Sequence, residues 1–202
     1  MAAENDFLEG KKKALKKLAK SKNENKVDKE ILPIINMIND SQDYYTSSSC
    51  AGRIVLLEIP RIGDKKSAEF LGKWHRTIAF DEILSAAKKA KTGLLWLLAQ
   101  PPIIHIAADD TAAADKMIKI ANASGFKNSG VKSIGKKIII EVCSTERLDA
   151  PIGREGTLFC NGEYLQLLVD IANEVIEKSA VKLHRFEQKL RKYLSTRKTT
   201  QQ

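Results

Sequence analysis

The chain has 202 residues, of which 43% are apolar, and its net charge at neutral pH is +9. This length gives room for one good-sized domain or for two small ones that share a core, and the apolar content argues against wholesale disorder. No apolar run approaches the roughly 20 residues that a helix needs to cross a bilayer, so we predict a soluble protein with no membrane association. Three widely spaced cysteines and the lack of a secretory leader favour a reducing cytoplasm over a disulfide framework.

The positive charge is concentrated at the two ends of the chain. Residues 1–26 carry a net charge of +4 and residues 178–202 a net charge of +7, whereas the body between them is at −2. Rows of lysine can neutralise phosphates, but lysine-rich helix faces are also often simply solvated. If these ends bind RNA, the residues that we expect to contact it are Lys12, Lys13, Lys16, Arg185, Lys189, Arg191 and Lys192.

Apolar periodicity and turn residues predict alternating helices and strands. In chain order we expect a helix over 7–20, a helix from Asp28 to Ile38, a strand ending at a turn at Ala51-Gly52, a returning strand over 54–59, a loop over 61–69, a strand over 70–78, a helix from Asp81 to Gly93, strands over 94–99 and 103–107, a helix that is capped by Asp109 or Asp110 and runs to Ala123, a hairpin over 126–143, a loop over 150–156, a strand over 157–160 and a long helix from Gly162.

This order predicts the fold class. Strands and helices alternate without a strict βαβ rhythm, and at least two hairpins are expected, so we predict an α+β protein with a mixed β-sheet flanked by helices. No glycine-rich dinucleotide or phosphate loop is present, which argues against a Rossmann-like fold. We expect a single domain over residues 1–195, with a basic first helix and a long basic last helix, and a flexible tail over 196–202.

The stretch from Tyr44 to Ile54 gathers hydroxyls, a thiol, a glycine and a guanidinium. Most serines and threonines are ordinary turn or edge-strand residues. However, the fork of Arg53 suits a phosphate or carboxylate, Gly52 lets a ligand approach the backbone, and Tyr45 could stack on a base. The nearby cation could activate Cys50, whose other interpretation is a small buried residue.

The histidines and cysteines indicate no metal site. His75, His105 and His184 form no paired ligand pattern with one another or with the cysteines. A lone histidine next to an aromatic residue, such as His75 after Trp74, is more often structural. If the protein is an enzyme whose substrate must lose a proton, His75 is the first candidate for the base that removes it and Cys50 is the second.

Several segments, in order along nearly the whole chain, resemble the tRNA wybutosine-synthesizing methyltransferase family, the third protein of that pathway, in its archaeal form. They are the stretch from Tyr44 to Ile54, Trp74-His75, 102–105, 125–131, the loop at Pro151, and 168–173. The sequence departs from the expected pattern at Ala51, in place of a small hydroxyl residue, and at Ser47, in place of threonine. Both changes are conservative.

The resemblance implies an enzyme outside the Rossmann-like methyltransferases. It implies transfer of a methyl group from S-adenosyl-L-methionine to N4 of a demethylwyosine-type guanosine beside the anticodon of tRNA-Phe, with no obligate protein partner. We assign cofactor or base binding to Ser48, Ser49, Gly52, Arg53, Ser129 and Gly130. The alternatives are a non-catalytic RNA-binding module, in which the hairpin only grips phosphate, and a cysteine-dependent hydrolase.

Overall fold

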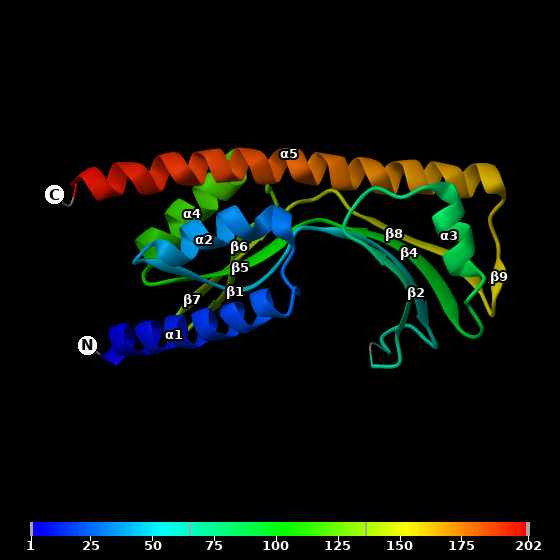
Figure 1. The fold of residues 1–202 in the computed structure, drawn as a ribbon, viewed down its shortest axis with the longest axis horizontal. Helices are drawn as coiled ribbons and strands as arrows, with labels where there is room; N and C mark the ends of the chain where they lie inside the picture. Colours follow the sequence, from blue (N-terminus) through cyan, green and yellow to red (C-terminus); the bar gives the residue numbers. More distant parts are fainter. Residues whose placement is uncertain (1, 65, 136, 201–202) are drawn as a thin grey trace. The chain divides into compact units, whose positions relative to one another are not determined.

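Figure 1 shows the computed structural model, which describes residues 2–64, 66–135 and 137–200. Its contacts group the chain into two compact units. Unit 1 comprises Met1–Ala51, Pro102–Thr145 and Ala180–Gln202, and unit 2 comprises Gly52–Pro101 and Glu146–Ser179. Each unit contains helices and its own antiparallel sheet, so the predicted α+β class and the absence of a Rossmann-like parallel sheet are confirmed. The single domain stays a prediction.

Unit 1 is built on a four-stranded sheet with the order β1-β5-β7-β6. Its elements are α1 (Ala2–Asn23), η1 (Lys29–Ile31), α2 (Leu32–Asp40), β1 (Tyr44–Cys50), β5 (Ile103–Ala108), α4 (Thr111–Ala123), β6 (Gly130–Ile134), β7 (Ile138–Cys143) and the part of α5 (Gly162–Thr200) from residue 180. All its pairings are antiparallel. The predicted hairpin over 126–143 is confirmed as β6 and β7.

Helices cover both faces of this sheet (Figure 1). On one face, Ile104, Ile106 and Ile140 pack with residues of α2, α4 and α5 in the main core of the unit. On the other face, Phe7 of α1 packs on the ring of Tyr45, with 5.1 Å between ring centroids. Alternation along each strand therefore divides its side chains between a large core and a smaller one under α1.

Local signals explain several element ends. Asp110 accepts a hydrogen bond from the backbone N–H of Ala113 at 2.7 Å and so caps α4, as predicted. Gly125, which follows α4, has a φ of +104°, a value that favours glycine. Asp28 does not cap its helix with its side chain; instead its Oδ2 accepts from the N–H of Ala51 at 2.8 Å and fixes the chain after β1.

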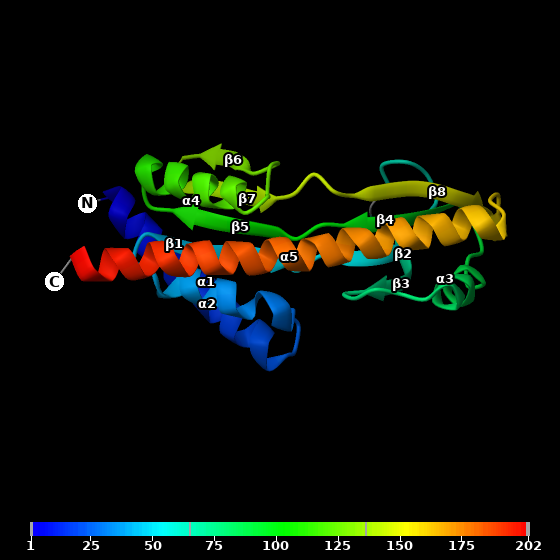
Figure 2. The ribbon, with the colours of Figure 1, turned by 90° about the horizontal axis from the view of Figure 1, so that it is seen from above.

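Unit 2 is built on a five-stranded sheet with the order β3-β2-β4-β8-β9. Its elements are β2 (Arg53–Ile59), β3 (Glu69–Trp74), α3 (Phe80–Ala87), β4 (Leu94–Gln100), β8 (Leu148–Arg154), β9 (Thr157–Leu158) and residues 162–179 of α5. Ile54, Leu56 and Leu97 pack with Leu165, Leu168 and Val169 of α5, which crosses one face of the sheet (Figure 2).

Two strand predictions were wrong. The expected hairpin at Ala51-Gly52 does not form, because β1 pairs with β5 whereas β2 pairs with β3 and β4. The polar β1 suits the edge of its sheet, and the apolar β2 suits a central position in another. The predicted loop over 150–156 lies largely in β8, where Pro151 is opposite Trp96 next to a register shift, one of the places where a sheet tolerates proline.

The mixed sheet of the prediction is replaced by two antiparallel sheets. The long last helix is confirmed as α5, which continues to Thr200 and so includes most of the segment expected to be a tail, while Gln201 and Gln202 lie outside the described residues. Within the described ranges, no helix combines the length and apolar character needed to span a membrane.

Candidate functional site

Three polar side chains lie opposite one another across three neighbouring strands of unit 1. The register places Ser48 of β1 opposite His105 of β5, and His105 opposite Glu141 of β7. Ser48 Oγ lies 2.9 Å from Nδ1 of His105, and Nε2 of His105 lies 3.0 Å from Oε2 of Glu141. Ser48 is exposed, so this row, which we call the Ser-His-Glu row, opens to the outside of the sheet.

A bulge in β1 puts Ser48 into this row. The register shifts between Thr46 and Ser48, which makes Ser47 the extra residue. Thr46 faces the main core and bonds to Asn39 of α2, its backbone N–H donating to Oδ1 at 2.8 Å. A bulge redirects the side chains that follow it, and here it turns the hydroxyl of Ser48 to the same face as the imidazole of His105.

Charge at one end of the row sets the direction of its hydrogen bonds. Lys132 of β6 lies 2.7 Å from the other oxygen of Glu141. Burial alone would raise the pKa of the Glu141 carboxyl, but hydrogen bonds and charge from Lys132 and then His105 outweigh it, so this pKa is lower than usual. An ionised carboxylate only accepts hydrogen bonds, so Nε2 of His105 carries the proton that it donates to Glu141. In the neutral imidazole, the lone pair of Nδ1 then accepts from the hydroxyl of Ser48.

This arrangement can move a proton. The Ser48 hydroxyl is the exposed end, the imidazole of His105 is the acceptor behind it, and the carboxylate of Glu141 orients the ring and can stabilise it when charged. It is the logic of a general base held in place by a third group.

Sequence reasoning missed His105 and Glu141 as functional residues. Each is the one titratable side chain in a strand of otherwise apolar or small residues, Ile103–Ala108 and Ile138–Cys143, apart from the terminal Cys143. That pattern was a usable signal. The pairing of the two strands was the missing information, because it depends on the register of residues 36 positions apart.

The structure separates the predicted ligand-binding residues of β1. Ser49 is opposite Ile104, which faces the main core, so Ser48 and Ser49 point to opposite faces of the sheet. Ser48 and Ser49 therefore cannot contact one ligand on the open face together. Cys50 is half-buried and pairs with Ile103 in the same sheet.

The predicted pair Ser129 and Gly130 lies in the turn before β6 and at the start of that strand. Ser129 Oγ donates to the carbonyl oxygen of Phe126 at 2.7 Å and accepts from the N–H of Cys143 at 3.2 Å. Its hydroxyl thus fixes the turn before β6, and its assignment to cofactor binding stays a prediction. Gly130 is opposite Glu141, and a Cβ added there would meet no atom within 4 Å, so the space beside that carboxylate stays open.

Arg53 and His75 belong to unit 2. Arg53 begins β2, its Nε donates to Oε1 of Gln100 at 2.7 Å, and its guanidinium lies 5.8 Å from the ring centroid of Phe70. Within the described ranges, its two Nη groups form no hydrogen bond or ion pair in the structure. They can therefore hold an anionic group such as a carboxylate. His75 is the first residue after β3, which ends at Trp74 rather than at Ile78.

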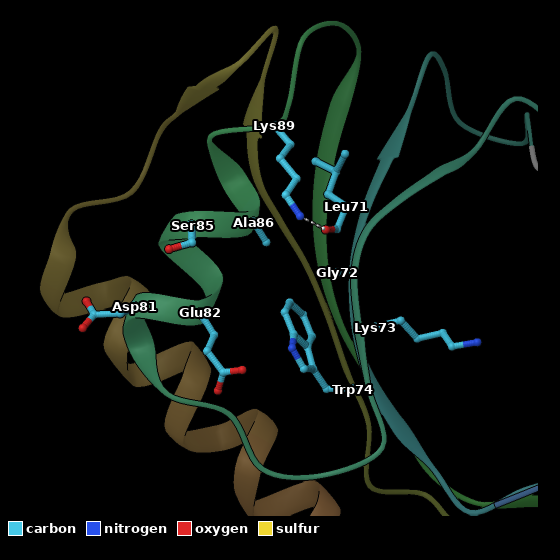
Figure 3. A pocket seen from close by; sticks show the side chains of 9 residues that line it. All are labelled: Leu71, Gly72, Lys73, Trp74, Asp81, Glu82, Ser85, Ala86 and Lys89. Atoms are coloured by element: carbon cyan, nitrogen blue, oxygen red, sulfur yellow. Dashed lines mark hydrogen bonds between the residues drawn. The ribbon is translucent and has the colours of Figure 1, made fainter.

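Unit 2 also contains an open pocket of about 440 Å³ between β3 and α3 (Figure 3). It is lined by Leu71, Gly72, Lys73, Trp74, Asp81, Glu82, Ser85, Ala86 and Lys89. The indole of Trp74 covers Gly72 so closely that a Cβ there would come within 1.9 Å of Cη2. Arg76 holds Glu82 through hydrogen bonds of 2.7 and 3.0 Å, and the pKa of Glu82 falls to about 2, chiefly because of this partner.

The predicted RNA-binding residues differ in their exposure to solvent. Tyr45 is only 1% exposed, and its hydroxyl accepts a hydrogen bond from Lys137 at 3.0 Å, so it cannot stack on a base in this conformation and that prediction was wrong. Lys12, Lys13 and Lys16 are exposed on α1. On α5, Arg185, Lys189, Arg191 and Lys192 are exposed too. Lys11 instead bonds to the carbonyl oxygen of Ser41, and burial lowers its pKa.

Comparison with known proteins shows which family the chain resembles. The model of the family described as Methyltransferase TYW3 matches residues 9–192. A relative from Pyrococcus horikoshii is 42% identical over 92% of this chain and 95% of its own length, and one from Methanocaldococcus jannaschii is 40% identical over 91% and 96%. Both are named as tRNA(Phe) 7-((3-amino-3-carboxypropyl)-4-demethylwyosine(37)-N(4))-methyltransferases.

Solved structures agree. The structure titled PH1069 protein from Pyrococcus horikoshii matches with a TM-score of 0.89 and 42% identity, covering 94% of this chain and 98% of that one. A hypothetical protein from Aeropyrum pernix matches at 0.70, with 27% identity over 81% of this chain and 96% of its own. The fold and its relatives thus define a methyltransferase with antiparallel sheets rather than a Rossmann-like one. The chain belongs to the Methyltransferase TYW3 family, as its sequence motifs predicted.

Proposed function

We propose that this chain transfers a methyl group from S-adenosylmethionine to N4 of a 4-demethylwyosine-type base at position 37 of tRNA(Phe), in the synthesis of wybutosine derivatives. The observation that carries the proposal is the 42% identity, over 92% of the chain, to a relative named for that reaction. The Ser-His-Glu row supports it independently, because it offers a proton acceptor on the open face of a sheet.

The balance of the reaction explains why a proton acceptor is needed. S-adenosylmethionine supplies an electrophilic methyl carbon, whose bond to sulfur breaks as the bond to N4 forms, and the electron pair stays on sulfur. The nitrogen of a 4-demethyl base loses one proton in the process. We assign that proton to Ser48 Oγ, whose own proton passes to Nδ1 of His105 while Glu141 stabilises the charged ring.

Arg53 fits the methyl donor. A methionine moiety ends in a carboxylate, and the Nη groups of Arg53 are available to bind one in the bidentate manner that this side chain favours. Gln100 and the ring of Phe70 hold the guanidinium in place. Gly52 precedes it and has a φ of +99°, which a larger residue would rarely adopt. Positioning of the two reacting atoms is the main contribution that we expect from the enzyme.

His75 and Cys50 stay proposals for the proton acceptor, as the sequence suggested. In His105, one ring nitrogen is hydrogen-bonded to the Ser48 hydroxyl and the other to the Glu141 carboxylate. Single substitutions therefore rank the three candidates. We expect His105→Ala to lower kcat most.

The function is tested with tRNA(Phe) that carries the 4-demethyl base and with methyl-labelled S-adenosylmethionine. We expect one methyl group to appear on that base in nucleoside mass spectrometry, and none on tRNA already methylated at N4. Absence of transfer to the 4-demethyl base would contradict the proposed function. Absence of heat on titrating S-adenosylmethionine into the protein would favour a non-catalytic RNA-binding module.

The role of Arg53 has its own test. Arg53→Ala should weaken the affinity for S-adenosylmethionine about tenfold to a hundredfold, since a hydrogen-bonded charge pair contributes about 1.5–3 kcal/mol. Arg53→Lys should recover only part of it, because lysine keeps the charge but loses the fork. Arg61→Ala, at an exposed residue of the same unit, is the matched control and should bind as the wild type does. Equal affinity of Arg53→Ala and the control would rule out this role.

A further inference from the structure

Unit 1 has a concave surface between α4 and the part of α5 after residue 180. It has a volume of about 420 Å³ and is lined by Lys116, Lys119, Ile120, Ala123, Lys189, Lys192, Tyr193 and Thr196. Four of these eight residues are lysines and none is acidic. We call this surface the lysine groove.

The spacing of the lysines explains how the groove forms. Lys116 and Lys119 are three residues apart on α4, and Lys189 and Lys192 are three apart on α5, so each pair lies on one face of its helix. Ile120 and Tyr193 form apolar parts of the wall between the two pairs. Nζ of Lys116 lies 5.5 Å from the ring centroid of Tyr193, which holds that ammonium at the wall of the groove.

Few acidic groups neutralise these lysines. Lys119 forms an ion pair with Asp115 at 2.6 Å, but both side chains are mostly exposed, at 70% and 60%, so the pair is weak and the lysine is easily released. Glu187 of α5 is engaged by Arg191 at 2.8 Å. Four like charges around one concave surface repel one another, and an anionic partner removes that cost.

The composition of the groove favours RNA over protein. Protein interfaces are depleted in lysine and enriched in exposed aromatic and apolar anchors, whereas Ile120 is 8% exposed and Tyr193 is half-buried. Contacts to nucleic-acid phosphates come largely from lysine and arginine. Lysine acts there as a point charge that reads no sequence.

We propose that the lysine groove binds the sugar-phosphate backbone of the tRNA substrate, with Lys116 and Lys119 of α4 acting together with Lys189 and Lys192 of α5. This inference rests on the proposed function and deepens it: it names two contact residues on a helix outside the two basic ends of the chain. It also separates Lys189 and Lys192 from Arg191, which does not line the groove and is paired with Glu187.

The test is the dependence of tRNA affinity on KCl concentration, measured by fluorescence anisotropy with labelled tRNA. The variant replaces the four groove lysines with glutamine. Each lost phosphate contact lowers the slope of log affinity against log salt by about 0.7–0.9, so we expect the slope to flatten by about 3. A labelled RNA duplex of unrelated sequence should show the same change, because the groove contacts phosphates alone.

A matched variant controls for net charge. Lys66, Lys88, Lys91 and Lys178 are exposed lysines of unit 2, and replacing these four with glutamine removes the same charge without changing a residue that lines the groove. We expect its slope to change by less than about 0.5. Equal slopes for the two variants would overturn the proposal, as would an unchanged slope in the groove variant whose melting temperature matches that of the wild type.

Different results would contradict the groove proposal and the proposed function. Binding of S-adenosylmethionine, measured by calorimetry, should be the same in the wild type and in both variants. If the wild type methylates tRNA but the groove variant keeps the wild-type salt slope, only the groove is wrong. If the wild type transfers no methyl group, the proposed function is wrong, and the salt slopes still decide whether the groove binds RNA.

Discussion

The sheets of the two units carry their polar side chains in different ways. In unit 1, Ser48, His105 and Glu141 form a hydrogen-bonded row across three strands. In unit 2 the middle parts of β2 and β4 are apolar, and Arg53, Glu58 and Trp74 stand at or next to strand ends. A row across strands acts as one coupled network that depends on the register of all its strands, whereas side chains at strand ends act singly. Substitutions in the two units should therefore differ in kind.

The largest effect is expected in the Ser-His-Glu row. His105→Ala removes the group that accepts the proton through Ser48, so kcat should fall about 10²–10⁴-fold while the affinity for tRNA stays unchanged. Ser48→Ala should lower kcat too, and the double variant should be no worse than His105→Ala alone, because the two residues act together. Single-turnover methylation and tRNA titrations measure these quantities.

His184→Ala controls for the loss of a histidine in the same unit, since His184 is exposed on α5 and bonds to Gln188. It should keep the wild-type kcat. If the losses in kcat for the Ser48 and His105 variants were strictly additive, the row would not be a coupled unit. The difference that we infer between the sheets of the two units would then not hold.

A pair of glycines tests packing in the two sheets. Gly72→Ala in unit 2 places a Cβ within 1.9 Å of the Trp74 ring, so the indole must move and the free energy of unfolding should fall by about 1–3 kcal/mol. Gly130→Ala in unit 1 meets no atom within 4 Å and should leave stability within about 0.5 kcal/mol of the wild type. Chemical denaturation compares the two variants, and equal losses would contradict the contacts that the structure shows at these glycines.

The sequence predicted the elements that depend on local signals but not the pairing of distant strands. Helices such as α4, with Asp110 at one end and Gly125 at the other, are determined locally and were predicted correctly. The family was recognised from short motifs. The hairpin at Ala51-Gly52 was wrong because the turn signal is local, whereas the choice of partner strand depends on packing that distant residues provide.

The same difference applies to the candidate site: features that depend on one residue were predicted, and features that depend on strand pairing were not. Arg53 was identified from its own chemistry, which needs no partner, although its role is still a proposal. His105 and Glu141 were missed because neither carries a functional signal of its own, and only strand pairing brings their side chains to 3.0 Å from one another. Tyr45 was misassigned because exposure cannot be read from a residue's type: the same ring that could stack on a base packs instead on Phe7.

Tyr45→Phe tests the hydrogen bond that the hydroxyl of the buried Tyr45 forms, and a moderate effect is expected. The variant loses the hydrogen bond between the Tyr45 hydroxyl and Lys137, and we expect a loss of about 0.5–1.5 kcal/mol in the free energy of unfolding. Since the ring is 1% exposed, the affinity for tRNA should not change. An unchanged free energy of unfolding in Tyr45→Phe would mean that the hydrogen bond to Lys137 does not stabilise the fold.

The smallest effect is expected at the exposed ion pair of Arg76 and Glu82 in unit 2. Arg76 lowers the pKa of Glu82 from 4.5 to about 2, so the folded state binds this proton more weakly than the unfolded state does. Its contribution to stability is therefore complete above pH 4.5 and is lost as the pH falls from 4.5 towards 2. The melting temperature of Glu82→Gln should lie slightly below that of the wild type at neutral pH and approach it below pH 4.5, whereas Glu177→Gln, at an exposed residue of α5, should show no such convergence. A difference between wild type and Glu82→Gln that stays constant down to about pH 3 would mean that Arg76 does not stabilise the charged carboxylate.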